Sequence, residues 1–520
     1  MFLRCRLVLV AVLAGLALLL GGTMYRYSLA GENDESPAKD EGKKDDTTAD
    51  ESTQPEEELP QAEIDECKKG AQKTRKLEFK TDVKIGLQDR ETLKKKMEQD
   101  FFEETPPERM DEVQKTLRKF GLIPKDFDLG KFLVDLLTEQ IGGFYDPESK
   151  ELYIMKGSDK EDESGTEAAM LKMLGVSNRK IVLVHELTHS LQDQHYDLLT
   201  MPRSDPDIED HNDDTVSAVQ ALFEGEATYV MYEWMYGKMG TSLDSIPDIG
   251  KEMEKGMRDE MGNKTGDLMS KAPAFIRESL LFPYIKGLIW FIGLKKHGGW
   301  EAVNKAYADL PASTEQILHP KKYYGEERDN PTILTTPKLD ELVGTDWKEL
   351  DDNVVGQFAL DIVMHEFFET SARIRNVAKG WDGDNYRIFD NPKAGRVLLV
   401  WLTTWDTEKD AGQFFEVYGE LIPKKYKDAK SAKSDEKLKV WMTLEDMVSI
   451  EIRGTDVLVV ESAPEGLLDK ITSLVWEKTT KEEMKEVKRM PPPKKKDKKD
   501  DTKKEDDTKT ENDNDEEEEE

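Results

Sequence analysis

The chain has 520 residues, which is enough for one large domain or two of medium size. Its formal net charge of -34 at pH 7 argues against nucleic acid and anionic lipid surfaces as partners. Because the chain has 2 cysteines, Cys5 and Cys67, we expect a hydrophobic core and a metal, and not disulfides, to stabilise the fold. Cys67 is expected to be a surface thiol.

The N-terminal segment has the features of an export signal. Arg4 and Arg6 precede an apolar stretch without charged residues, 7–25. That stretch is also long enough to span a bilayer as an uncleaved anchor, with the arginines on the cytoplasmic side. We therefore expect residues 1–30 to be a signal peptide or a membrane anchor, with 7–25 as a possible membrane tether. Both alternatives place the rest of the chain outside the cytoplasm, whether secreted, periplasmic or membrane-anchored.

Two further segments are too polar to bury a core. Residues 31–70 and 489–520 are rich in Asp, Glu, Lys and Thr and poor in large apolar side chains. We expect the first to be a disordered acidic stem and the second a disordered charged tail.

Between these segments, the hydrophobic periodicity predicts a mostly helical α+β fold. Turn residues at 146–149 predict a hairpin of two short strands. Ser313 and Gln316 form a candidate capping box. The other elements predicted in this part are a strand at 77–87 and helices at 90–102, 108–120, 129–141, 215–238, 273–297 and 300–310.

Beyond about residue 331 the pattern changes, and we interpret 331–488 as a smaller α+β C-terminal domain that follows a domain at 71–330. The elements predicted there are a long helix at 350–377, strands within 381–405, a helix at 406–419, a hairpin at 448–460 and a helix at 465–477.

The motif HExxH occurs at His185, Glu186 and His189, inside an apolar run of helical period. Helical residues four apart lie on one face, about 5–6 Å apart at Cβ, so both imidazoles can bind one zinc ion at about 2.0–2.1 Å. Glu186 can then serve as the general base toward a water that the zinc activates. Ser177 or Asn178 is a plausible N-cap of this helix. A histidine pair satisfied within the core is the structural alternative, and the helical context favours zinc.

A catalytic zinc site needs a third protein ligand, and the sequence offers three candidates. Glu224 lies on a later helix, where small neighbours permit close packing. His195 completes the spacing used by metzincins, but Gln192 replaces their glycine, so a continuing helix carries His195 about 15 Å from His185. Glu226 is rotated by about 200° from Glu224 on the same helix, so both cannot face the metal. We favour Glu224.

The runs HELTH from His185 and EGEA from Glu224 resemble the gluzincin branch of zinc metallopeptidases. The longer run HELTHSLQDQH, with GFYDP from Gly143 and STEQILHP from Ser313, is similar to a group of uncharacterised exported bacterial proteins. The resemblance covers roughly residues 79–324. It implies a zincin-like domain with a small sheet and an active-site helix, with His185, His189 and Glu224 as ligands and Glu186 as general base.

Peptide hydrolysis also needs a group that stabilises the oxyanion. His319 is our candidate for this catalytic role, together with Tyr323, Tyr324 and Tyr145. The predicted strand at 152–155 is either a candidate edge strand that pairs with an extended peptide substrate or an ordinary strand of a sheet.

The sequence thus predicts a zinc-dependent endopeptidase-like hydrolase that acts on protein or peptide substrates. One alternative is a catalytically silent binding or scaffold protein that keeps the zincin fold. Another is a zinc hydrolase of a non-peptide amide or ester. The sequence predicts no particular oligomeric state.

Overall fold

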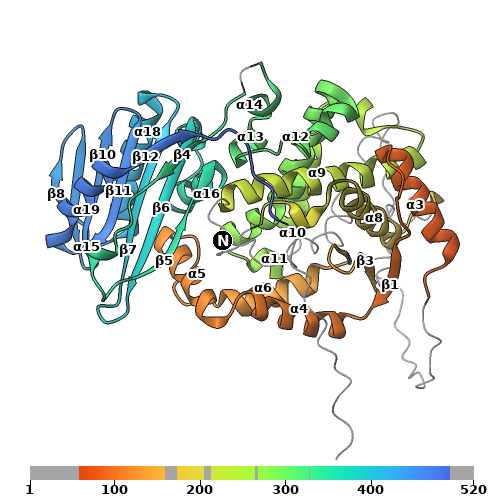
Figure 1. Cartoon of the computed structure of the whole chain (residues 1–520), viewed down its shortest axis with the longest axis horizontal. Coiled ribbons are helices and arrows are strands. Elements are labelled where there is room, and N and C mark those ends of the chain that lie inside the picture. The colour runs from red at the N-terminus through yellow and green to blue at the C-terminus, as the bar shows by residue number, and fades with distance from the viewer. Residues whose placement is uncertain (1–57, 158–172, 204–211, 264–267, 327, 492–520) are drawn as a thin grey trace, which may run out of the picture.

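The computed structural model describes residues 58–157, 173–203, 212–263, 268–326 and 328–491. It has an α+β architecture, as predicted, in which a helical part and a seven-stranded sheet lie side by side (Figure 1). The predicted signal peptide or anchor, most of the stem and most of the tail lie outside the described residues. Among the helices that are described, none combines the length and the apolar composition needed to cross a bilayer.

Helix α3 (Gln61–Arg75) lies where the acidic stem was predicted to be disordered, so that prediction is wrong for residues 61–70. The acidic residues of α3 bind the basic first turn of helix α8 (Asn178–Tyr196): Arg179 binds Glu63 at 2.7 Å and Lys180 binds Glu66 at 2.9 Å. Pairing with another element, which composition does not reveal, is what orders this segment.

The expectation that Cys67 is a surface thiol is also wrong. Cys67 lies on the face of α3 that packs against α8 and is fully buried, with its Sγ 3.9 Å from the carbonyl oxygen of Lys180. Burial raises the pKa of this thiol to about 12. Cys67 therefore stays protonated at neutral pH and behaves as an apolar residue of the core.

A small sheet covers one side of α8. Its strands are β1 (Lys84–Gln88), β2 (Gly143–Asp146) and β3 (Glu151–Met155), in the order β1-β3-β2. The strand predicted at 152–155 is confirmed, but β3 pairs with both of its neighbours. It is therefore an ordinary sheet strand, and the alternative role as an edge strand is wrong. The predicted hairpin is confirmed, and β2 is an edge strand that packs on α8.

Three helices form the centre of the helical part: α8, α9 (Asp213–Lys238) and α12 (Ala274–Ala306). Helices α9 and α12 cross so closely that a Cβ on Gly225 or Gly287 would collide with the backbone of the other helix. The shorter helices are α4 (Arg90–Glu104), α5 (Pro107–Phe120), α6 (Leu129–Gln140), α10 (Ile249–Asn263), α11 (Leu268–Lys271), α13 (Thr314–Leu318) and α14 (Lys321–Tyr324).

The second part is an antiparallel sheet in the order β5-β6-β7-β11-β10-β9-β8. Side chains of β7 alternate between two cores: Trp401 packs beneath α18 (Glu408–Lys425), and Val400 and Leu402 belong to the core beneath α19 (Glu465–Lys478). The strands are β5 (Lys348–Asn353), β6 (Trp381–Asn391), β7 (Arg396–Trp405), β8 (Lys430–Ser434), β9 (Leu438–Thr443), β10 (Asp446–Arg453) and β11 (Asp456–Ala463).

The prediction of one long helix at 350–377 is wrong in two places. Its start forms β5, and the rest is split into α16 (Gly356–Phe367) and α17 (Ala372–Val377). Gly356 has a φ of 74°, and a Cβ there would collide with the carboxylate of Asp214. Phe368 is extended, which ends α16.

The hydrophobic core continues across residue 330. Phe120 of α5 packs edge-on against Tyr386 and Trp401 of the sheet, with ring centroids 5.2 and 5.5 Å away. After β12 (Thr480–Glu483), which pairs with β4 (Thr332–Thr335), the chain returns to the helical part. Arg489 there donates to the carbonyl of Tyr196 at the end of α8, so residues 489–491 do not belong to a disordered tail.

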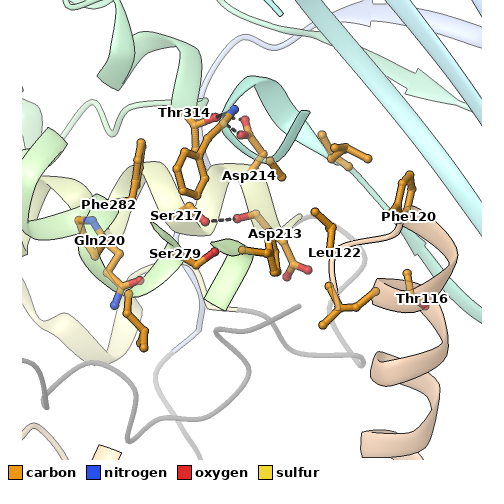
Figure 2. A pocket seen from close by; sticks show the side chains of 18 of the residues that line it. Thr116, Phe120, Leu122, Asp213, Asp214, Ser217, Gln220, Ser279, Phe282 and Thr314 are labelled. Atoms are coloured by element: carbon orange, nitrogen blue, oxygen red, sulfur yellow. Dashed lines mark hydrogen bonds between the residues drawn. The ribbon is translucent and has the colours of Figure 1, made fainter. Parts of the chain in front are cut away.

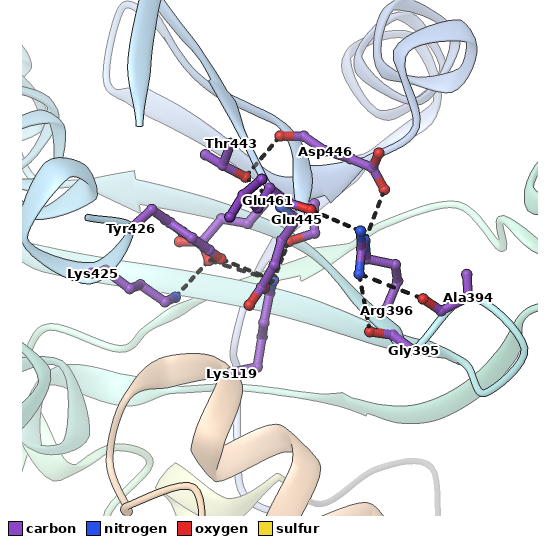
Figure 3. A network of polar contacts seen from close by, with 12 residues as sticks. Lys119, Ala394, Gly395, Arg396, Lys425, Tyr426, Thr443, Glu445, Asp446 and Glu461 are labelled. Atoms are coloured by element: carbon purple, nitrogen blue, oxygen red, sulfur yellow. Dashed lines mark hydrogen bonds and ion pairs between the residues drawn. The ribbon is translucent and has the colours of Figure 1, made fainter. Parts of the chain in front are cut away.

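A buried polar cluster joins α5 to the sheet. Figure 3 shows Lys119 extending from α5, where its Nζ donates to the hydroxyls of Tyr426 at 2.9 Å and Ser462 at 2.6 Å. The fully buried carboxylate of Glu461 lies 3.9 Å from the same Nζ and accepts from Lys425 at 2.5 Å. Burial lowers the pKa of Lys119 to about 8.

This pKa predicts a pH-dependent stability. Between pH 8 and 10.5 the folded state holds fewer protons on Lys119 than the unfolded state, whose pKa is near 10.5. The free energy of unfolding of the wild type should therefore rise with pH in this window relative to that of Lys119→Met. Urea unfolding of both proteins at several pH values measures the difference, and a difference that does not change with pH contradicts the assignment.

Candidate metal centre

Helix α8 carries both histidines of the HExxH motif. The Ser177 side chain accepts from the Lys180 N–H, so Ser177 is the N-cap, as one of the two predicted alternatives had it. The helix continues to Tyr196, and His195 accordingly lies away from the motif, with its Nε2 2.9 Å from the carbonyl oxygen of Glu78. The prediction that a continuing helix carries His195 past the site is confirmed.

Helix α9 supplies the third group. Oε2 of Glu224 lies 3.2 Å from Nε2 of His185 and 3.4 Å from Nε2 of His189. The two Nε2 atoms are 2.9 Å apart. His185 and Glu224 are fully buried, and His189 is nearly so. The structure thus brings the three predicted ligands together, and these are the atoms that one cation could contact at the same time.

Glu226 faces the other side of α9. Its carboxylate forms a buried ion pair with Arg75 of α3 and accepts a hydrogen bond from the Tyr307 hydroxyl. Residues two positions apart on a helix are rotated by about 200° from each other, so Glu224 points toward α8 and Glu226 points away from it. The structure therefore leaves Glu224 as the one candidate for third ligand.

The donor set fits zinc. Two neutral imidazoles and one carboxylate are a ligand set of catalytic zinc sites, which leave one position open. Tetrahedral ligands about 2.05 Å from zinc lie about 3.3 Å from one another, close to the distances observed here. In the described part of the chain, Nδ1 of His185, Oε1 of Glu224 and Oε1 of Glu186 are buried without a hydrogen-bond partner. Such a concentration of unsatisfied buried atoms is unusual in a site that serves packing alone.

Burial and charge shift the titration of the cluster. Burial lowers the pKa of His185 to about 4. Burial also disfavours a charged His189, but the carboxylate of Glu224 outweighs it and raises the pKa to about 9. The two histidines in turn lower the pKa of Glu224 against the effect of burial. At neutral pH the negative charge of Glu224 is therefore balanced by the positive charge of His189.

Gln192 holds the second histidine, a role that the sequence analysis missed. Its Oε1 lies 2.8 Å from Nδ1 of His189, and its Nε2 donates to the carbonyl oxygen of Phe223 at 2.9 Å. A proton on Nδ1 leaves the Nε2 lone pair free for a metal. Gln192 also ties α8 to the residue before Glu224. Its position three residues after His189, on the same helix face, was the signal in the sequence.

Glu186 projects toward β2. Its Oε2 accepts from the backbone N–H of Tyr145 at 2.9 Å, and burial raises the pKa of the carboxyl to about 8. The Tyr145 hydroxyl donates to Asp193, which also binds Lys150. Tyr145, a candidate for stabilising the oxyanion, thus binds Glu186, the predicted general base, through its backbone N–H, while its hydroxyl binds Asp193 of α8.

The structure does not bring His319 to the cluster. His319 caps the end of α13, and its Nε2 lies 3.0 Å from Nε2 of Gln357. Thr314 of α13 bonds Asp214, which lies ten residues before Glu224 on α9, or about 15 Å along the axis. This placement gives no support to the catalytic role predicted for His319.

The other two tyrosines have structural partners. The Tyr323 hydroxyl donates to the carbonyl of Asp309, and Tyr324 stacks on His297 with ring centroids 4.8 Å apart. These two tyrosines were predicted as candidates because they follow the capped turn closely in the sequence. Their contacts belong to the end of α12 and the turn after it.

A family model described as a domain of unknown function, DUF8575, matches residues 342–472. The matched region contains all seven strands of the large sheet and none of the three grouped ligands. No curated protein and no solved structure matches the chain.

Glu224 and Glu226 allow a matched test. We expect Glu224→Gln to lower zinc affinity by at least about 100-fold, because one of three ligands is lost. Glu226→Gln should keep zinc affinity but lower the free energy of unfolding by about 3–5 kcal/mol, since it leaves the buried Arg75 charge unpaired. Competition titration with a zinc chelator and urea unfolding measure the two effects. The reverse pattern would mean that Glu226 is the ligand.

Gln192 predicts a second, smaller effect. Gln192→Leu should weaken zinc binding by about 10–100-fold, because His189 loses the group that fixes its tautomer. Gln192→Glu keeps the acceptor for Nδ1 but not the donor to Phe223, so it should restore most of the affinity. If Gln192→Glu binds zinc as weakly as Gln192→Leu, the contact with α9 matters and the contact with His189 does not.

Proposed function

We propose that this chain is a zinc-dependent metallopeptidase with a zincin-like domain, and that it hydrolyses peptide bonds in protein or peptide substrates. The observation that carries the proposal is the convergence of His185, His189 and Glu224 at 2.9–3.4 Å, with the carboxylate of Glu186 on the same helix. Together with the resemblance of the motifs to gluzincins, this arrangement favours hydrolysis over a purely structural cluster.

The residues of the chain have distinct roles in this proposal. Zinc, when bound, would act as a Lewis acid that lowers the pKa of water and polarises a carbonyl group. Glu186 accepts the proton of the attacking water and later delivers it to the leaving amine. The Tyr145 N–H holds Glu186 for both transfers. Gln192 keeps His189 in the tautomer that binds metal.

The edge strand β2 replaces β3 in the proposed contact with substrate. The N–H of Tyr145 on β2 reaches Glu186, so this side of the strand faces the active-site helix. An extended peptide that runs along β2 would bring its main chain past the general base. We further propose an extracytoplasmic location, which rests on the charged and apolar pattern of the N-terminal segment.

A buried Glu186 also argues against a silent scaffold. One of its oxygens has no hydrogen-bond partner in the described part of the chain, and an unsatisfied buried carboxyl oxygen costs about 1–3 kcal/mol or more. A protein that kept only the fold would be stabilised by losing this group. A buried group that lowers the stability of the fold and is nevertheless present is typical of a functional site.

Glu186→Gln tests the function. The variant should bind zinc as the wild type does and should cleave an unfolded protein such as reduced casein at least about 100-fold more slowly. Glu301→Gln, on the exposed face of α12, is the matched control and should be fully active. A chelator should abolish wild-type cleavage, and added zinc should restore it.

The alternatives give different results in the same assay. Zinc-loaded wild type that cleaves no peptide bond at all would support the scaffold. Turnover of amide or ester model compounds without cleavage of peptides would support a non-peptide hydrolase.

A further inference from the structure

A cavity lies between the candidate metal centre and the seven-stranded sheet. Its volume, measured as the space open to the centre of a water molecule, is about 80 Å³. One water needs about 10–15 Å³ on this measure, so the cavity is larger than a packing defect. Helices α5, α9, α12 and α16 surround it, and Figure 2 shows Gln220, Ser217 and Asp213 of α9 along one side.

The cavity lies about one helical turn from the candidate metal ligand Glu224, although none of the three candidate ligands lines it. Gln220 and Ser217 precede Glu224 by four and seven residues, so all three lie on one face of α9. Tyr284 of α12 lines the cavity, and its ring centroid is 6.2 Å from that of His185. Tyr284 therefore lies between the cavity and the first candidate ligand, and the cavity follows α9 from Gln220 toward the start of the helix.

The side chain of Gln220 also indicates that the cavity binds a ligand. Its side chain lines the cavity and is 5% exposed, yet its amide makes no hydrogen bond with any described residue. An amide that faces the space of a cavity without a protein partner is free to hydrogen-bond a ligand that enters it. The amide lies one helical turn from Glu224, at the end of the cavity nearest the metal ligands.

The rest of the lining is mostly apolar and aromatic. Phe282 and Phe358 face each other across α12 and α16 with ring centroids 4.2 Å apart, and Phe275 and Leu280 complete this side. A cavity of this composition suits a large aliphatic or aromatic group, with a few polar atoms that fix its orientation.

We propose that this cavity is the subsite for a large apolar side chain of the peptide substrate beside the scissile bond, with Gln220 hydrogen-bonded to the substrate main chain. The inference rests on the proposed function for its choice of occupant. The short distance from the candidate metal ligands, through Tyr284 and Gln220, favours a peptide that is anchored at the metal over a free apolar molecule. Selection among substrates then depends on the size of one side chain.

The first experiment fills the cavity. Ala359 lines it from α16 and is half-buried, so Ala359→Phe adds a ring there with modest risk to folding. Ala372→Phe, at the exposed start of α17, is the matched control. The measurement is kcat/KM for fluorogenic peptides that differ in one residue next to the cleaved bond.

Ala359→Phe should lower kcat/KM for peptides with Phe or Leu at that position by at least about tenfold, and change it little for Ala or Gly. Ala372→Phe should match the wild type. Gln220→Leu should raise KM for all peptides alike with zinc content unchanged. Equal losses across all peptides in Ala359→Phe, or no preference in the wild type, would overturn the assignment.

A binding experiment separates this inference from the proposed function. N-acetyl-Leu-Phe-amide is titrated calorimetrically into zinc-loaded Glu186→Gln and into the same protein with Ala359→Phe added. Binding that is at least about tenfold weaker in the second protein supports the subsite even if the wild type hydrolyses nothing. Equal binding by both proteins, or binding of oleate in preference to the peptide, overturns it.

Discussion

The helical period is the constraint on which the candidate site depends. On α8 it aligns His185 with His189, and on α9 it turns Glu224 toward them and Glu226 away. Each carboxylate of α9 thus has one partner: the imidazoles for Glu224 and the guanidinium of Arg75 for Glu226. A rotation of α9 by one residue would lose both contacts. The close crossing of α9 with α12 at Gly225 and the link through Gln192 oppose such a rotation.

Buried charge is handled differently in the two parts of the molecule. Glu461 in the sheet part has a lysine and two tyrosines as partners, so its cluster is satisfied without any ligand. Around His185, Glu186 and Glu224 the described residues leave three buried polar atoms unsatisfied. Protein interiors rarely tolerate this unless something else supplies the missing contacts. The contrast supports the proposal that the function lies in the helical part, and the sheet part contributes walls of the neighbouring cavity.

The sequence predicted most helices and the grouping of His185, His189 and Glu224, because both follow from local periodicity. HExxH is a spacing on one helix, and the rotation between Glu224 and Glu226 is fixed by the helix that carries them. It failed where partners distant in sequence decide. The acidic composition of α3 concealed its pairing with α8, and the charged strand β5 forms because Tyr386 and Arg387 of β6 satisfy its aspartates. His319 was predicted because it follows the capped turn at Ser313, and in the structure its imidazole contacts Gln357 of α16. Gln220 gave no sequence signal, because its unpaired amide is visible only in three dimensions.

X-ray absorption spectroscopy of the zinc-loaded full chain tests the central claim most directly, because it reports the atoms bound to the metal without any assay of activity. The account predicts one zinc per chain, with two imidazole nitrogens at about 2.0–2.1 Å, one or two oxygens at similar distance and no sulfur. A sulfur shell at about 2.3 Å, an all-oxygen shell or a failure to bind zinc would contradict it.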